Sequence, residues 1–157
     1  MTALLFTDTM NLRDHMLNLI KRLFQGKMLA LQTEEIIKKY DVKLVVLFGS
    51  QVTGYTHPES DIDIGVVFGA APKDMLKSYA GIEDALRPRF KKKARIQIVD
   101  LETTPLSLRF KAIENGKLLY AESAKYFVSY REKSALEYFD FKPVEDYCKK
   151  VFLGQTL

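Results

Sequence analysis

The chain has 157 residues, the length of one ordinary domain, and 47% of them are apolar, which is enough to build a buried core. Its formal net charge of +4 is compatible with an anionic substrate but is too small to indicate nucleic-acid binding by itself. Cys148 is the only cysteine, no apolar run approaches the ~20 residues of a membrane helix, and no secretory signal opens the chain, so we expect a cytoplasmic protein without disulfides.

Three elements are predicted in the first third of the chain. Apolar residues at helical spacing indicate a helix over 9–24, which Gly26 would end. A short helix is predicted from Thr33, as its N-cap, to Tyr40. The continuous β-rich apolar run 43–48 predicts a buried strand.

The middle of the chain alternates strands and helices. Residues 51–60 contain glycine and proline and read as a loop. A second strand is predicted over 61–68, a helix over 73–87, and a third strand over 94–99 with Asp100 at its exit.

The last third is predicted to be mainly helical. A helix is expected over 105–115, stopped by Gly116, followed by a short strand over 117–120. Two further helices are expected after Ser123, divided at Pro143 because proline disrupts a helix interior.

These elements predict a small sheet with helices around it, in an α/β or α+β domain. We find no repeats and no obvious linker, so residues 1–157 are interpreted as one domain. Its catalytic core would cover about 33–122, with a helical C-terminal extension over about 123–157.

One segment carries most of the functional signal: Gly49-Ser50, ten further residues, and then Asp61-Ile62-Asp63. Asp61 and Asp63 are two apart, so on an extended strand their side chains point to the same face. Two carboxylates that close repel each other unless a proton or a cation lies between them, and Mg²⁺ prefers such oxygen ligands. The segment therefore predicts phosphoryl or nucleotidyl transfer.

Asp100 is the predicted third acid of this site. Sites with two metal ions clamp the attacking and leaving oxygens of a phosphoryl transfer, and three carboxylates from two neighbouring strands can hold such a pair. Asp100 would ligate the ion nearer the incoming hydroxyl and help to take its proton. The alternative is that Asp61 is a loop or cap residue, Asp63 is merely solvated, and Asp100 is an ordinary strand-exit residue.

Gly49 and Ser50 are the predicted phosphate-binding residues. Glycine lets a phosphate approach the backbone, and serine offers a hydroxyl and an N–H group. An ordinary turn is the alternative interpretation. Among weaker candidates, Arg109 and the basic run that starts at Lys91 could contact phosphate, against the alternatives of a salt bridge and a solvated face. P-loop, dinucleotide-binding and H-E-x-x-H motifs are absent.

The string GSQVTGYTHPESDIDIGVVF, with RIQIVDL after it, resembles the DNA polymerase β-type nucleotidyltransferases, in particular the minimal nucleotidyltransferases. The resemblance implies a small mixed sheet flanked by helices, ATP as substrate, and Mg²⁺, with two ions expected. It also implies that Gly49 and Ser50 bind the triphosphate, while Asp61, Asp63 and Asp100 carry the metal and the catalysis. Many relatives have Arg or Lys where this chain has Thr53, so a phosphate contact would have to come from elsewhere.

The downstream sequence VDLETTPLSLRFKAIENGKLLYAES resembles the minimal nucleotidyltransferases that act as antitoxins and pair with HEPN-domain toxins. That resemblance implies transfer of AMP to a tyrosine hydroxyl of a cognate HEPN ribonuclease, in a hetero-oligomer with that toxin and without direct nucleic-acid binding. Two alternatives remain at this point. One is nucleotidyl transfer to a small molecule such as an antibiotic, and the other is an antitoxin that acts by contact alone.

Overall fold

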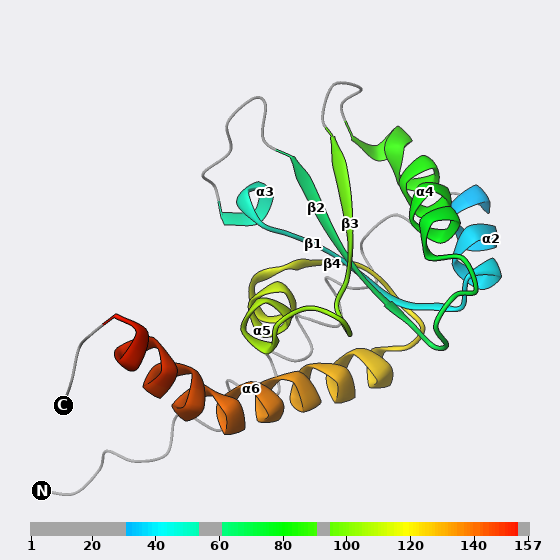
Figure 1. The fold of residues 1–157 in the computed structure, drawn as a ribbon. Helices are drawn as coiled ribbons and strands as arrows, with labels where there is room; N and C mark the ends of the chain where they lie inside the picture. The colour runs from blue at the N-terminus through cyan, green and yellow to red at the C-terminus, as the bar shows by residue number, and fades with distance from the viewer. Residues whose placement is uncertain (1–30, 54–60, 91–94, 154–157) are drawn as a thin grey trace, which may run out of the picture.

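The computed structural model describes residues 31–53, 61–90 and 95–153, and its centre is a sheet of four strands (Figure 1). The strands are β1 (Val42–Phe48), β2 (Ile62–Phe68), β3 (Ile96–Asp100) and β4 (Lys117–Ala121). Their order across the sheet is β3-β2-β1-β4. β1 runs antiparallel to both β2 and β4, whereas β2 and β3 are parallel. The predicted small mixed sheet is therefore confirmed.

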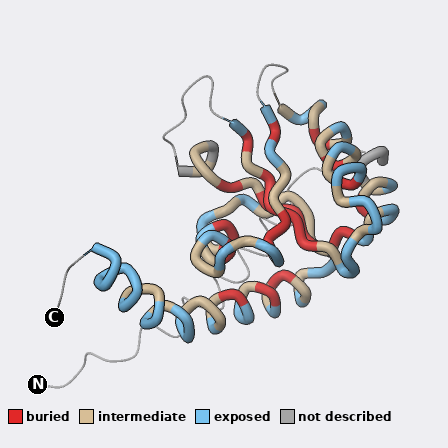
Figure 2. Tube along the Cα trace, in the orientation of Figure 1, coloured by how far each residue is buried: buried red, intermediate tan, exposed pale blue. Residues whose placement is uncertain are grey.

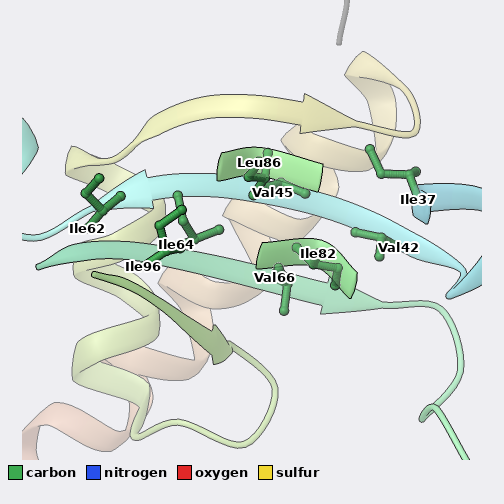
Figure 3. Close-up of a cluster of buried hydrophobic side chains, with 9 residues drawn as sticks. All are labelled: Ile37, Val42, Val45, Ile62, Ile64, Val66, Ile82, Leu86 and Ile96. Carbon is green, nitrogen blue, oxygen red and sulfur yellow. The ribbon is translucent and has the colours of Figure 1, made fainter. Parts of the chain in front are cut away.

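One face of the sheet is covered by two helices, α2 (Leu31–Lys39) and α4 (Met75–Leu86). Apolar side chains of the strands and of both helices form a buried cluster between these layers (Figure 3). The cluster consists of Ile37, Val42, Val45, Ile62, Ile64, Val66, Ile82, Leu86 and Ile96. Asp74 caps α4, because its carboxylate accepts a hydrogen bond from the N–H group of Lys77.

The other face packs against α5 (Leu106–Asn115) and the first half of α6 (Ala124–Phe152). A second buried cluster fills this interface and is made of Leu44, Val46, Phe48, Val67, Leu101, Ala112, Ile113, Phe127 and Tyr130. The sheet is thus the middle of three layers, as the predicted helix-flanked sheet requires. Along β2 and along residues 44–48 of β1, buried side chains at successive positions alternate between the two clusters, which fixes the face to which each residue of these segments belongs.

The sequence-based predictions place the strands within about two residues. Two helical predictions and one loop prediction need comment. The helix expected over 9–24 lies outside the described residues. Thr33, the expected N-cap, lies inside α2, which begins at Leu31. Part of the loop expected over 51–60 is helical, because α3 covers Ser50–Thr53, and its remainder is not described.

The predicted division of the C-terminal helices at Pro143 is wrong, since α6 continues through this proline. One ion pair spans the position, since the Lys142 ammonium lies 2.9 Å from the Asp146 carboxylate, and a second follows it, with Lys149 2.9 Å from Glu145. Such pairs support a helix surface and partly offset the lost backbone hydrogen bond. The half of α6 that contains Pro143 is largely exposed (Figure 2).

No helix among the residues that the structure describes is both long and apolar enough to cross a membrane.

Candidate active site

Gly49 and Asp63 meet where β1 ends and β2 begins. Phe48, the last residue of β1, pairs with Asp63, so the next residue lies directly beside the Asp63 carboxylate. Gly49 has a φ of +75°, a left-handed conformation that side chains disfavour. A Cβ at this position would overlap the Asp63 carboxylate and would come within 3.1 Å of its carbon. Two independent constraints therefore require glycine here.

Asp61 and Asp63 form the predicted carboxylate pair. Asp61 immediately precedes β2 and is exposed, whereas Asp63 is half-buried in the strand. Ile62 and Ile64 point into the cluster beneath α2 and α4, so Asp63 faces the opposite side of the sheet. Partial burial raises the pKa of Asp63 above its ordinary value, and the negative charge of Asp61 raises it further. The two carboxylates are close enough to interact, and no positive charge among the described residues lowers the pKa of Asp63.

Asp100 does not join this pair, and the prediction of a three-carboxylate cluster is wrong on this point. Asp100 pairs with Val66, whose side chain belongs to the cluster beneath α2 and α4. Burial raises the pKa of Tyr79 on α4, and the charge of Asp100 raises it further, which places Asp100 near α4. Its Oδ1 accepts a hydrogen bond of 3.0 Å from the N–H group of Glu102. Asp100 is a buried strand-end residue that stabilises the following turn.

The β3 residue beside Asp63 is Gln97. The two residues are direct partners in the parallel pairing, and Ile96 and Ile98 on either side of Gln97 face the opposite cluster. Residues paired in this way have their side chains on the same face, about 4.8 Å apart from strand to strand. The sequence already indicated that Gln97 lies on the opposite face from Ile96 and Ile98, because polar and apolar residues alternate there. The sequence-based prediction nevertheless chose Asp100, three residues later, because it is acidic.

Arg109 takes no part in the site. It is only 7% exposed, and its guanidinium lies 2.7 Å from the Glu137 carboxylate and 3.9 Å from that of Glu102. This is the salt-bridge alternative considered for Arg109, made between α5 and α6. Lys91 lies outside the described residues, and nothing is described of the Thr53 side chain at the end of α3.

Replacing Glu137 by alanine is expected to lower the free energy of unfolding by about 2–3 kcal/mol, because it leaves the buried Arg109 charge without its main partner. Thermal or urea unfolding measures the change. Glu132→Ala removes an exposed acid of the same helix and is expected to change the unfolding free energy by less than about 0.5 kcal/mol. Equal effects of the two variants would contradict the assigned role of Glu137.

The donor set fits one hard divalent cation. Asp61 and Asp63 provide two carboxylates on one face, and a cation relieves the repulsion between them. Among the described residues, no group of three or more His, Cys, Asp and Glu side chains could hold a metal ion. These residues therefore do not provide the expected site, in which three acids would hold two ions.

The geometry defines a class of protein: a small mixed sheet that presents a glycine turn and an Asp-x-Asp pair at adjacent strand ends, as nucleotide-transferring enzymes do. Residues 32–125 match the family described as polymerase beta, nucleotidyltransferase, which is well over half of the chain. The chain belongs to the DNA polymerase β-type nucleotidyltransferase family.

Solved structures share this fold. A chain of a toxin–antitoxin complex with AMP-PNP is 19% identical, has a TM-score of 0.62, and is matched over 78% of this chain and 96% of its own length. A chain of the complex between a tri-AMPylated Shewanella oneidensis HEPN toxin and its MNT antitoxin is 19% identical, with a TM-score of 0.57, over 80% and 99%. A chain of the MntA–HepT complex is 16% identical, with a TM-score of 0.57, over 78% and 97%. No curated protein matches the chain.

Proposed function

We propose that this chain is a Mg²⁺-dependent adenylyltransferase that serves as an antitoxin, transferring AMP from ATP to a tyrosine hydroxyl of a cognate HEPN ribonuclease. The observation that carries the proposal is the Asp61–Asp63 pair against Gly49 in a chain of the nucleotidyltransferase family. Support for the partner comes from the solved structures of similar fold. They are toxin–antitoxin complexes, one with an ATP analogue and one with an AMPylated HEPN toxin.

Each residue of the site has a defined role in this proposal. Asp61 and Asp63 would hold Mg²⁺, which when bound supplies positive charge to the phosphates of the nucleotide. Because Gly49 has no side chain, it leaves room for the Asp63 carboxylate and keeps the backbone accessible to phosphate. Ser50 follows at the start of α3 and supplies a hydroxyl next to the glycine.

The reaction is an in-line displacement at the α-phosphorus of ATP. The tyrosine oxygen forms a bond to this phosphorus, the bond to the bridging oxygen of the β-phosphate breaks, and pyrophosphate leaves. The proton of the tyrosine hydroxyl passes to solvent. Docking of the toxin places its hydroxyl in line, which makes the step effectively unimolecular. ATP is available in the cytoplasm, and a chain whose single cysteine, Cys148, is an exposed free thiol suits the reducing conditions there.

Intact-mass spectrometry of the cognate HEPN toxin tests the proposal. The toxin is incubated with the chain, ATP and Mg²⁺, beside an Asp61→Asn/Asp63→Asn double variant. We expect the wild-type chain to add one or more AMP units and the double variant to add none. Absence of any mass gain with the wild-type chain, despite a stable complex, would overturn the proposed transfer.

A contact-only antitoxin is the second candidate, and one observation favours it. The β3 position beside Asp63 holds Gln97, an amide, and Asp100 lies on the other face. If the double variant still forms the complex and still blocks the ribonuclease while AMP transfer is absent from both chains, contact is sufficient. If the wild-type chain blocks the ribonuclease and the double variant does not, the contact-only antitoxin is excluded.

A further inference from the structure

The strand beside the carboxylate pair contributes a neutral side chain to the site. Gln97 is the direct partner of Asp63 in the parallel pairing of β2 and β3, and it is exposed on the same face. With about 4.8 Å between the strands, its amide can reach any ligand that bridges Asp61 and Asp63. A carboxylate at position 97 would complete a three-acid site, whereas the amide adds no charge.

No described acid compensates for this amide. Asp100 lies three residues further along β3, which is about 10 Å at the rise of a strand and an odd number of residues, so it belongs to the other face. The part of the chain that the structure describes holds no group of three potential acidic, histidine or cysteine ligands. Among the described residues, Asp61 and Asp63 therefore supply the charge of the site.

We infer that Gln97 occupies the third ligand position and limits the site to one divalent cation per chain. This inference rests on the proposed nucleotidyl transfer. Two carboxylates balance the charge of one divalent cation. A second cation would have to bind through the neutral amide and the nucleotide. The affinity of a site for such ions becomes weaker when the site has fewer charged ligands. The ion that remains is the one carried with the nucleotide between Asp61 and Asp63.

The neutral amide also restricts the acceptor. An amide cannot take the proton of an attacking hydroxyl, so the acceptor has to ionise without a carboxylate of β3. A phenol, with a pKa of about 10, ionises much more readily than an aliphatic hydroxyl. Gln97 therefore favours tyrosine over serine or threonine as the acceptor.

Counting bound Mn²⁺ tests the inference. Electron paramagnetic resonance of free Mn²⁺ gives the number of ions bound per chain. The measurement is made with an ATP analogue that has a methylene bridge between its α- and β-phosphates. The ions bound in a blank that contains only the nucleotide are subtracted. We expect one ion for the wild-type chain and two for Gln97→Glu, which has nearly the same shape but adds a charge. Asp100→Asn is the matched control and should remain at one ion.

Two ions in the wild-type chain, or one ion in Gln97→Glu, would overturn the inference. Gln97→Asp provides a second variant if Gln97→Glu fails to fold, as judged by circular dichroism. The proposed function fails in a different way: its failure appears as equal ion counts for the wild-type chain and the Asp61→Asn/Asp63→Asn variant. A wild-type chain with two ions, both lost in that variant, would leave the proposed function intact and refute the role of Gln97.

Discussion

Replacing Gly49 by alanine is expected to abolish nucleotidyl transfer and to destabilise the fold. The left-handed backbone at this position would cost a side chain about 1–2 kcal/mol. The added Cβ would also overlap the Asp63 carboxylate, so either the carboxylate or the end of β1 has to move. We expect the free energy of unfolding to fall by about 2 kcal/mol or more, measured by urea unfolding, together with loss of AMP transfer.

Gly69→Ala is the matched control, since this glycine follows the other end of β2. Its backbone is not left-handed, and a Cβ there would come nearest to the side chains of Asp41 and Lys43, which lie at the opposite end of β1 from Gly49. Transfer by Gly69→Ala should stay close to that of the wild-type chain. If Gly49→Ala retained full activity and stability, the close contact between Gly49 and Asp63 would have no functional meaning.

Replacing Asp63 by asparagine is expected to remove activity while raising stability. Loss of one charged ligand should slow AMP transfer by about 10²–10³-fold or more. In the absence of metal, the raised pKa of Asp63 means that the folded state binds its proton more tightly than the unfolded state does. The ionised carboxylate therefore destabilises the fold at neutral pH, and asparagine removes this cost.

The sign of the pH dependence makes this prediction specific. The stability contributed by protonated Asp63 is fully present below its ordinary pKa of 3.8 and is lost as the pH rises through the raised value. Metal-free melting curves should therefore show a gain of about 2 °C for Asp63→Asn at pH 7, equivalent to roughly half a kcal/mol after solvent screening. This gain should disappear near pH 3.

With Mg²⁺ and nucleotide, the wild-type chain should melt at a higher temperature than Asp63→Asn, because these ligands stabilise only the wild-type chain. Asp84→Asn, an exposed change on α4, is the control and should melt like the wild-type chain under all of these conditions. A lower melting temperature for metal-free Asp63→Asn at pH 7 would show that Asp63 stabilises the fold, contrary to its raised pKa.

Local patterns were sufficient to predict most of the architecture. The apolar runs that became β1 and β2 and the alternation in β3 are strong local signals, and the small sheet with flanking helices follows from them. The sequence also assigned Gly49 and the Asp-x-Asp pair to one site, but the contact between Gly49 and Asp63, with the overlap that a Cβ would produce, appears only in three dimensions.

The error over Asp100 has a definite cause. A strand residue reaches a given face only if its offset from the register partner is even, and the register is set by pairing between strands that are distant in sequence. Gln97 pairs with Asp63, so Asp100 falls on the wrong face despite its acidic side chain and its position at the strand exit. The continuity of α6 through Pro143 was missed for a different reason, because the ion pair between Lys142 and Asp146 across the proline was not weighed against the local cost of the proline.

The pairing of Phe48 with Asp63 has a consequence for how such proteins can vary. The two halves of the site are aligned by the antiparallel ladder of β1 and β2, and the number of residues that connect them has no part in this alignment. Longer or shorter connections between Ser50 and Asp61 should leave the glycine and the carboxylates in place, because closing a longer loop costs little. A search for distant homologues should therefore require two paired strands with this register and leave the spacer length open.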